Sequence, residues 1–330
     1  MPQTRSIYSR WSAFSIFLVS ATVIALQLML MRSLSVTHYH HFSYLVISTA
    51  LLGFGTSGTF LTLVFDRLRS RFFFWNQLFG LLFVISIPIT YHVAAALNID
   101  TQYMLYSGRQ ILLLTVYNAL LFVPFFLGGA IIGFNLSFFK SEVPRLYSAN
   151  LVGSGGGGIG ALGVMYLAPA YLLPVTLTPL ALLAQLVFVI HAHKQQKSTL
   201  SAAFIIPPML IAALSFMFPP SEKVDQYKDL ASFLRLERQN DARHIARRYS
   251  PQSQLDLFES KTFHQALFAG AHATVPPPGQ LALLLDGETA GPVFTIDNKE
   301  EAEIMDFTPQ SLPYRLLDRP RVLLLSLIHI

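Results

Sequence analysis

Two glycine-rich runs have the spacing of a nucleotide-binding loop. Residues 53–58 (Gly-Phe-Gly-Thr-Ser-Gly) and 153–158 (Gly-Ser-Gly-Gly-Gly-Gly) both fit G-x-G-x-x-G, in which glycines let the backbone approach a pyrophosphate. That use needs a preceding strand and a helix start open to water, whereas both runs lie inside apolar stretches. Small residues also let apolar helices pack closely in lipid. We therefore predict helix packing, and not nucleotide binding, at both runs.

The histidines form two groups with the potential to bind a metal ion. His38, His40 and His41 follow the first apolar stretch, and His191 and His193 flank a later one. A zinc site needs three or four ligands that converge on one point, and the apolar stretches place the two groups at opposite faces of a membrane. We therefore predict that the chain has no metal site.

The polar side chains inside the apolar stretches are uncharged amides. They are Gln27, Asn76, Gln77, Asn118, Asn135 and Asn150. Amides in membrane helices commonly form interhelical hydrogen bonds. The stretches contain no carboxylate and no lysine, and ion- or proton-coupled transporters usually depend on such groups. The pattern therefore does not favour coupled transport.

The composition defines the class of protein that carries these residues. Of 330 residues, 53% are hydrophobic and 12% are charged, about half the charged fraction of a typical soluble domain. This excludes an ordinary cytosolic enzyme and a disordered chain, and the lack of cysteine excludes disulfides and thiolate metal sites. Residues 1–218 have 11 basic and 3 acidic residues (net +8), whereas residues 219–330 have 12 and 15 (net −3). Because the positive charge belongs to the apolar part, it indicates no nucleic-acid partner.

An α-helical, polytopic membrane domain of about seven spans is predicted over residues 13–218, after a cytoplasmic tail at 1–12. A membrane helix needs about 20 apolar residues, and the stretches of suitable length are 13–31, 42–65, 72–95, 111–139, 149–172, 174–191 and 200–218. Nine basic residues lie on the N-terminal side of these spans and two on the other side, which places the N-terminus in the cytoplasm. We expect a multi-pass protein, in a bacterial inner membrane, with the lipid bilayer as its partner.

The less apolar part begins with a linker at 219–249, in which a short polar helix is predicted over 227–236. A small, mostly β domain is predicted over 250–318. The alternating pattern at 255–259 and the runs at 281–285 and 292–296 predict strands, and Asp286-Gly287 between the last two predicts a hairpin turn. An acidic helix is predicted at 300–307. Residues 321–325 (Arg-Val-Leu-Leu-Leu) predict the start of a buried strand.

Several segments in this order resemble the membrane-bound, spermidine synthase-like family. Leu283-Leu-Leu-Asp-Gly287 resembles the L-x-L-D-G of the small β-domain of spermidine synthases, and 250–260 (Ser-Pro-Gln-Ser-Gln-Leu-Asp-Leu-Phe-Glu-Ser) resembles the entry to that domain. Residues 319–325 (Arg-Pro-Arg-Val-Leu-Leu-Leu) are similar to the first Rossmann strand of these proteins, which implies that 319–330 is the start of a truncated Rossmann-like domain. Residues 146–153 (Leu-Tyr-Ser-Ala-Asn-Leu-Val-Gly) are similar to the L-Y-x-A-D-L-x-G of membrane-fused members, and Gln27 with Arg32 is similar to the E-x-x-x-x-R of their first span.

The resemblance implies a transferase of polyamine biosynthesis or a related SAM-dependent, methyltransferase-like enzyme. Decarboxylated SAM or SAM is the implied cofactor, and a small amine is the implied substrate. The chain departs from the family at Gln27 and Asn150, where some members have acidic residues, and at Ala290, where soluble synthases have glutamine. A Rossmann cofactor site needs a glycine loop after its first strand, and only Ser-Leu-Ile-His-Ile follows Leu325. We therefore expect an inactive N-terminal fragment that binds no cofactor, nominate no catalytic or cofactor-binding residue, and assign Asp286 to a turn.

An alternative is a polytopic transporter or receptor with a small extracytoplasmic β-domain. Seven spans with a cytoplasmic N-terminus would place residues 219–330 outside, whereas SAM-type cofactors are cytosolic. We expect an even number of crossings and a cytoplasmic β-domain, because the charge bias is large and the number of spans within 149–191 is easily miscounted.

Residues 325–330 match the in-frame translation of a transposon-end adapter used in sequencing libraries. We therefore expect that 326–330 are not natural sequence.

Overall fold

The computed structural model describes residues 2–100, 102–103, 106–196, 203–265, 273 and 276–317, and among these the side chains of 2–9, 40, 194–196 and 310 are not included. The chain divides into two compact units. One consists of Met1–Asp225 with Tyr249–Ser253, and the other of Gln226–Arg248 with Gln254–Ile330. The strand predicted at 321–325 and the segment 326–330 lie outside the described residues.

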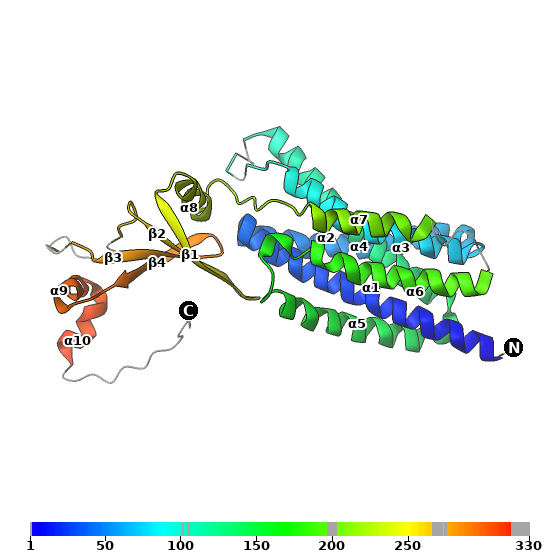
Figure 1. Ribbon diagram of the computed structural model, residues 1–330. Helices are drawn as coiled ribbons and strands as arrows, with labels where there is room; N and C mark the ends of the chain where they lie inside the picture. Colours follow the sequence, from blue (N-terminus) through cyan, green and yellow to red (C-terminus); the bar gives the residue numbers. More distant parts are fainter. Residues whose placement is uncertain are drawn as a thin grey trace. The chain divides into compact units, whose positions relative to one another are not determined.

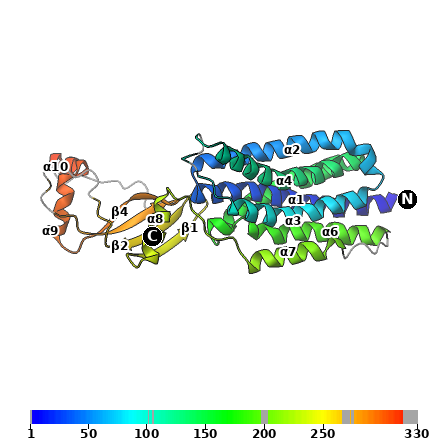
Figure 2. The same cartoon turned by 90° about the horizontal axis from the view of Figure 1, so that it is seen from above.

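The first unit is a bundle of long helices (Figures 1 and 2). Its α-helices are α1 (Pro2–Thr37), α2 (His40–Arg69), α3 (Phe72–Ala96), α4 (Gly108–Phe138), α5 (Val143–Val164), α6 (Thr178–Gln196) and α7 (Ile206–Met217), and short 3₁₀ turns lie at Lys140–Glu142, Ala170–Leu172 and Val175–Leu177. Helix α1 contacts α2, α4, α5 and α6, and Figure 2 shows it along the middle of the bundle. The core is apolar and rich in phenylalanine; Phe83, Phe125 and Phe134 are almost completely buried.

Within the described residues, five helices are long and apolar enough to cross a membrane. They are Arg10–Thr37, His41–Arg69, Phe72–Ala96, Gly108–Phe138 and Val175–His193. They suggest a membrane protein, and they coincide with five of the seven predicted spans. The predicted span 149–172 corresponds to α5, whose many glycines lower its hydropathy. The predicted span 200–218 corresponds to α7, whose 12 residues cover about 18 Å, less than the roughly 30 Å of a bilayer core. The prediction of seven spans is therefore not confirmed.

The chain leaves the bundle at the end opposite to its N-terminus. Helix α7 runs parallel to α3, because Phe204 contacts Phe74 near the start of α3 (6.0 Å between ring centres) and Phe218 O accepts a hydrogen bond from His92 Nε2 near its end (3.0 Å). Beyond α7, the backbone nitrogen of Asp225 donates to the carbonyl of the last residue of α1 (2.7 Å). The expected even number of crossings stays a prediction.

The second unit contains a four-stranded sheet in the order β1-β2-β3-β4 (Figure 1). The strands are β1 (Ala242–Tyr249), β2 (Gln254–Ser260), β3 (Gly279–Leu285) and β4 (Glu288–Thr295). Strands β2 and β3 pair antiparallel, as do β3 and β4. Helix α8 (Asp229–Arg238) precedes the sheet, and α9 (Lys299–Ala302), 3₁₀ turns at Glu303–Phe307 and Pro309–Ser311, and α10 (Leu312–Leu316) follow it. The three predicted strands and their hairpin are confirmed, whereas β1 occupies residues that were predicted to be linker.

Alternating side chains give the two central strands a buried face. Phe258 of β2 and the paired Ala282 of β3 are completely buried. Helix α8 covers this face, since the Phe233 ring stacks on Phe258 with 5.1 Å between ring centres. Asp256 has the same orientation as Phe258, because residues two apart in a strand share a face. A carboxylate therefore lies in the buried layer of the sheet.

Candidate functional site

The Asp286-Gly287 turn joins β3 to β4. Asp286 and Gly287 have positive φ angles of 50° and 82°, which two-residue hairpin turns of the favoured twist require. The Asp286 carboxylate accepts a hydrogen bond from Gln254 N (2.7 Å), and Asp286 N donates to Gln254 O (2.9 Å). Asp286 thus has the geometry of a turn former, and its carboxylate connects the turn to the start of β2.

Helix α8 holds the same turn from its N-terminal end. The buried Lys228 donates through Nζ to Asp286 O (2.5 Å), and Leu230 N donates to Gly287 O (3.0 Å). A lysine is rarely buried unless its ammonium group has hydrogen-bond partners. The turn therefore connects two strands of the sheet and the helix that covers it.

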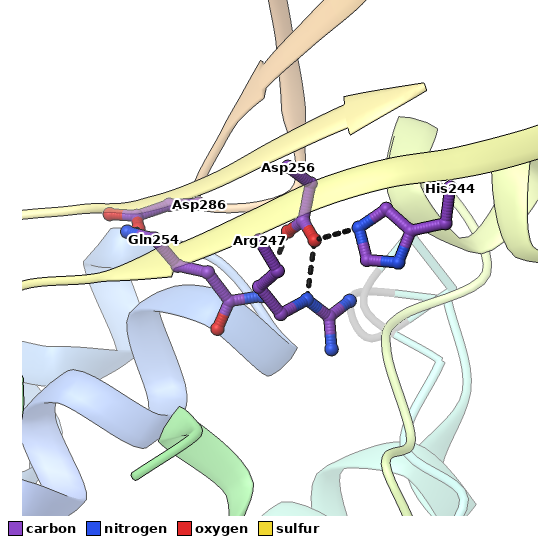
Figure 3. Close-up of polar contacts among 5 residues, drawn as sticks. All are labelled: His244, Arg247, Gln254, Asp256 and Asp286. Atoms are coloured by element: carbon purple, nitrogen blue, oxygen red, sulfur yellow. Dashed lines mark hydrogen bonds and ion pairs between the residues drawn. The ribbon is translucent and has the colours of Figure 1, made fainter. Parts of the chain in front are cut away.

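Asp256 is the centre of a buried polar cluster that also includes His244, Arg247 and Gln254 (Figure 3). Its side chain has no exposed surface. Oδ1 accepts a hydrogen bond from Arg247 Nε and lies 2.9 Å from His244 Nε2, and Oδ2 accepts a hydrogen bond from Gln254 Nε2 (2.8 Å). Both carboxylate oxygens are therefore occupied by donors, and strand β1 is joined to β2 through charged side chains.

Two opposing effects act on the pKa of Asp256. Burial favours the neutral acid and raises the pKa. The nearby imidazole of His244, the charge of Arg247 and the hydrogen bonds from Gln254 and Arg247 favour the carboxylate. These attractions outweigh burial, and the pKa of Asp256 lies below its usual value. Asp256 is therefore ionised at neutral pH.

This cluster has the properties of a structural centre. A general acid or base works best with a pKa near the working pH, whereas the pKa of Asp256 is lowered. Within the described residues, no three His, Asp or Glu side chains come together in a way that could hold a metal ion. The His244 ring stacks on Phe258 (4.4 Å between ring centres) and is 22% exposed. The geometry supports a role for Asp256 in holding β1 on the sheet.

The structure places the two glycine runs in helix contacts. On α5, a Cβ atom added to Gly153 or Gly157 would lie 2.3 Å or 2.2 Å from a backbone oxygen of α1. On α2, a Cβ atom on Gly53 would lie 2.7 Å from the Phe125 side chain of α4. Close packing is confirmed at these three glycines. Gly55 and Gly155 face open space, so the motif spacing itself has no structural role.

Four of the six amides in the apolar helices form the predicted interhelical hydrogen bonds, namely Asn76, Asn118, Asn135 and Asn150. Asn150 Oδ1 of α5 accepts from Ser20 Oγ of α1 (2.7 Å), and Asn118 Oδ1 of α4 accepts from Thr49 Oγ1 of α2 (3.2 Å). Asn135 Nδ2 of α4 donates to an amide oxygen of α3 (2.8 Å). Gln27 is half-buried within α1. These bonds satisfy polar groups within an apolar interior and fix the rotation of neighbouring helices.

The two histidine groups lie at opposite ends of the bundle. The His38 ring contacts Tyr117 (6.2 Å between ring centres), near the end of α1. The His191 ring stacks on Trp11 (6.5 Å between ring centres), near the start of α1.

Arg32, which with Gln27 resembles the motif of the family's first span, is buried, with 7% of its surface exposed. Its guanidinium donates a hydrogen bond to Ser35 Oγ (3.0 Å).

Sequence reasoning missed the polar cluster around Asp256. Strand β1 (Ala-Arg-His-Ile-Ala-Arg-Arg-Tyr) has few of the residues that favour strands, so its position in the sheet was not recognised. One signal was present: Asp256 stands two residues before Phe258, on the face that alternation predicts to be buried. A buried carboxylate needs hydrogen-bond donors or cations as partners, and His244 and Arg247 lie in the segment that precedes it in the sequence.

No protein family, no curated protein and no solved structure matches this chain.

Proposed function

We propose that this protein is a membrane-anchored member of the spermidine synthase-like class. The observation that carries the proposal is the order of its parts: apolar helices, then a small antiparallel sheet whose β3–β4 turn is Asp286-Gly287. The segments that resemble the family fall on defined elements, with 146–153 in α5, 250–260 around β2 and 283–287 at the β3–β4 turn. The helices would anchor the β-domain, and a multi-pass arrangement in a bacterial inner membrane is part of the proposal.

The proposed activity is transfer of an aminopropyl group, or a related SAM-dependent transfer, to a small amine. We assign this chemistry, and the binding of decarboxylated SAM or SAM, to a Rossmann-like domain that begins near residue 319, outside the described residues. No described residue receives a catalytic role. Asp256 and Asp286 would instead keep the β-domain in shape beside that domain.

A second candidate is a transporter or receptor with an extracytoplasmic β-domain, and one observation favours it. The chain leaves the bundle at the end opposite to its N-terminus, where Asp225 N bonds to Thr37 O. With the N-terminus in the cytoplasm, as the basic residues predict, and with every helix from α1 to α7 crossing the membrane, the β-domain would lie outside. A site that uses a cytosolic cofactor does not fit that location.

Two measurements distinguish these candidates. Sequencing the source DNA beyond the codon for Leu325 should show a glycine loop followed by an acidic residue at the end of the next strand; a stop codon directly after residue 330 would instead favour the second candidate. A phosphatase fused after Glu222 should be inactive if the β-domain is cytoplasmic. A phosphatase that is active there, with a green fluorescent protein that is dark at the same site, would refute the transferase proposal.

A further inference from the structure

His92 lies near the end of α3, beside the C-terminal end of α7. Its ring has two nitrogen atoms, and each lies within hydrogen-bond distance of a backbone carbonyl oxygen. Nδ1 is 2.7 Å from the oxygen of Pro88, four residues earlier in the same helix, and Nε2 is 3.0 Å from the oxygen of Phe218. The side chain is half-buried, and within the described residues it has no further polar contact. Two carbonyl groups therefore define the surroundings of the ring.

This pair of contacts fixes the charge that the ring needs. A carbonyl oxygen can only accept a hydrogen bond. A neutral imidazole has one N–H group and one nitrogen with a lone pair, whereas an imidazolium has two N–H groups. A neutral ring in this position would turn a lone pair towards one of the two carbonyl oxygens. Both contacts are hydrogen bonds only when His92 carries two protons and a positive charge.

The C-terminal end of α7 needs such a donor. The last carbonyl groups of a helix have no N–H partner within the helix. Pro219 and Pro220 follow directly after Phe218, and proline has no N–H to offer them. The C-terminal end of a helix also attracts a cation, because it is the negative end of the helix dipole. A protonated His92 supplies both the missing donor and the positive charge.

The other titratable groups around the end of α3 do not contact the ring of His92. On α3, α4 and the segments that follow α3 and α7, these groups are Tyr91, Asp100, Arg109, Tyr117, Glu222 and Lys223. Helix α7 itself contains no titratable residue. The hydroxyl of Tyr91 bonds instead to Ser33 Oγ (2.8 Å), and His92 forms no ion pair in the described part of the chain. The contact between α3 and the end of α7 therefore depends on the protons of one ring.

We propose that His92 is a proton-operated latch between α3 and α7. With two protons on its ring, His92 joins the end of α7 to α3. When the pH rises, Nε2 releases its proton to water and turns a lone pair towards Phe218 O, while the shorter bond from Nδ1 to Pro88 O is kept within α3. The end of α7 is then released. Because α7 is the last helix before the chain enters the second unit at Gln226, the latch makes the position of segment 219–225 sensitive to pH.

Distances between two spin labels test the latch in the full chain, held in nanodiscs. The chain has no cysteine, so Ala96→Cys and Met217→Cys, both at exposed positions, are the only sites that a thiol-specific label modifies. The distance distribution should be narrow at about pH 5 and broad at about pH 8, which brackets the range in which histidines titrate. The released population should grow about tenfold between these pH values, as expected for the loss of a hydrogen bond to a charged group.

Variants of the ring show whether His92 is the group responsible. His92→Lys keeps a charged donor up to pH 8 and should hold the narrow distribution at both pH values. His92→Gln cannot titrate and should give one distribution at both. The matched control is His264→Gln, which changes an exposed histidine of the second unit and should respond like the parent. A parent distribution that does not change with pH, or a pH response that persists in His92→Gln, overturns the proposal.

Nitrogen-15 NMR of histidine-labelled protein tests the charge of the ring directly, whether or not the variants pack well. The resonances that are missing from His92→Gln belong to His92. In the parent at about pH 5 they should be those of a ring with both nitrogens protonated, and at about pH 8 those of a ring protonated on Nδ1. A ring that is neutral at both pH values overturns the latch.

Discussion

Removing the charge of Asp256 measures what the buried cluster contributes to the sheet. In Asp256→Asn the shape of the side chain is kept, but Arg247, only 15% exposed, loses its counter-charge. Breaking a buried ion pair by removing one partner costs about 3–5 kcal/mol. Because His244 and Arg247 keep some contact with solvent, we expect Asp256→Asn to lower the stability of the sheet by an amount near the lower limit, about 3 kcal/mol.

The same strand offers a matched control. Glu259 pairs with Arg243 at 3.0 Å, and these side chains are 55% and 75% exposed. Exposed pairs of this kind contribute about 0–1 kcal/mol. Glu259→Gln also replaces a carboxylate by an amide in β2, so the two variants differ in burial and not in chemistry.

Hydrogen–deuterium exchange of the full chain in detergent provides the assay. Each 1.4 kcal/mol corresponds to a factor of about ten, so amides of β2 and β3 should exchange roughly 100-fold faster in Asp256→Asn. In Glu259→Gln the increase should stay below about fivefold. Equal changes in the two variants, or unchanged exchange in Asp256→Asn, would refute the assignment of the cluster as the structural centre of the sheet.

Three further outcomes are expected. Because the pKa of Asp256 is lowered, its contribution to the stability of the sheet is complete above the unfolded pKa of about 3.9 and is lost as the pH falls through the folded pKa. Amide exchange in β2 should therefore accelerate on acidification below about pH 4, and the acceleration should be smaller in Asp256→Asn. Equal acid sensitivity of the two proteins would contradict this. Gly157→Ala places a Cβ atom 2.2 Å from a backbone oxygen of α1 and should lower the thermal stability of the bundle. Gly155→Ala meets open space, so the stability of the bundle should be unchanged or higher by up to about 1 kcal/mol. Equal melting temperatures of the two variants would count against the packing argument. Asp286→Ala removes the acceptor for Gln254 N and puts alanine at a positive φ. Amides of the β3–β4 hairpin should therefore exchange roughly tenfold faster. An unchanged exchange rate in the hairpin would show that the turn does not need this carboxylate.

Local patterns allowed much of the fold to be predicted. Long apolar stretches predict helices because about 20 consecutive apolar residues have the length of a helix that crosses a bilayer. The hairpin at Asp286-Gly287 was predicted because positive φ angles at two successive positions depend on residue type alone. The predicted spans at α5 and α7 are not confirmed, because many glycines lower the hydropathy of α5 and the described helix of α7 is short.

The centre of the sheet depends on contacts between strands. Strand β1 is rich in charge, and two of its side chains, His244 and Arg247, meet Asp256 only after β1 and β2 become neighbours. Strand propensity is a weak guide where cross-strand contacts decide stability. The sequence showed that Asp256 alternates with apolar residues, but it did not show which cations approach the carboxylate.

The residues alone were enough to predict an apolar helical part and a small sheet with a tight Asp-Gly turn, because hydrophobic pattern and turn chemistry are local properties. Tertiary structure alone decided which of many similar residues matter. Gly153 and Gly157 face the backbone of α1 while Gly155 faces open space, although all three belong to one glycine run. Likewise, His92 and Phe218, 126 positions apart in the numbering, come into contact only in the folded bundle. The physical reason is that the rotation of a helix about its axis, and the choice of its neighbour, are set by the packing of the whole bundle.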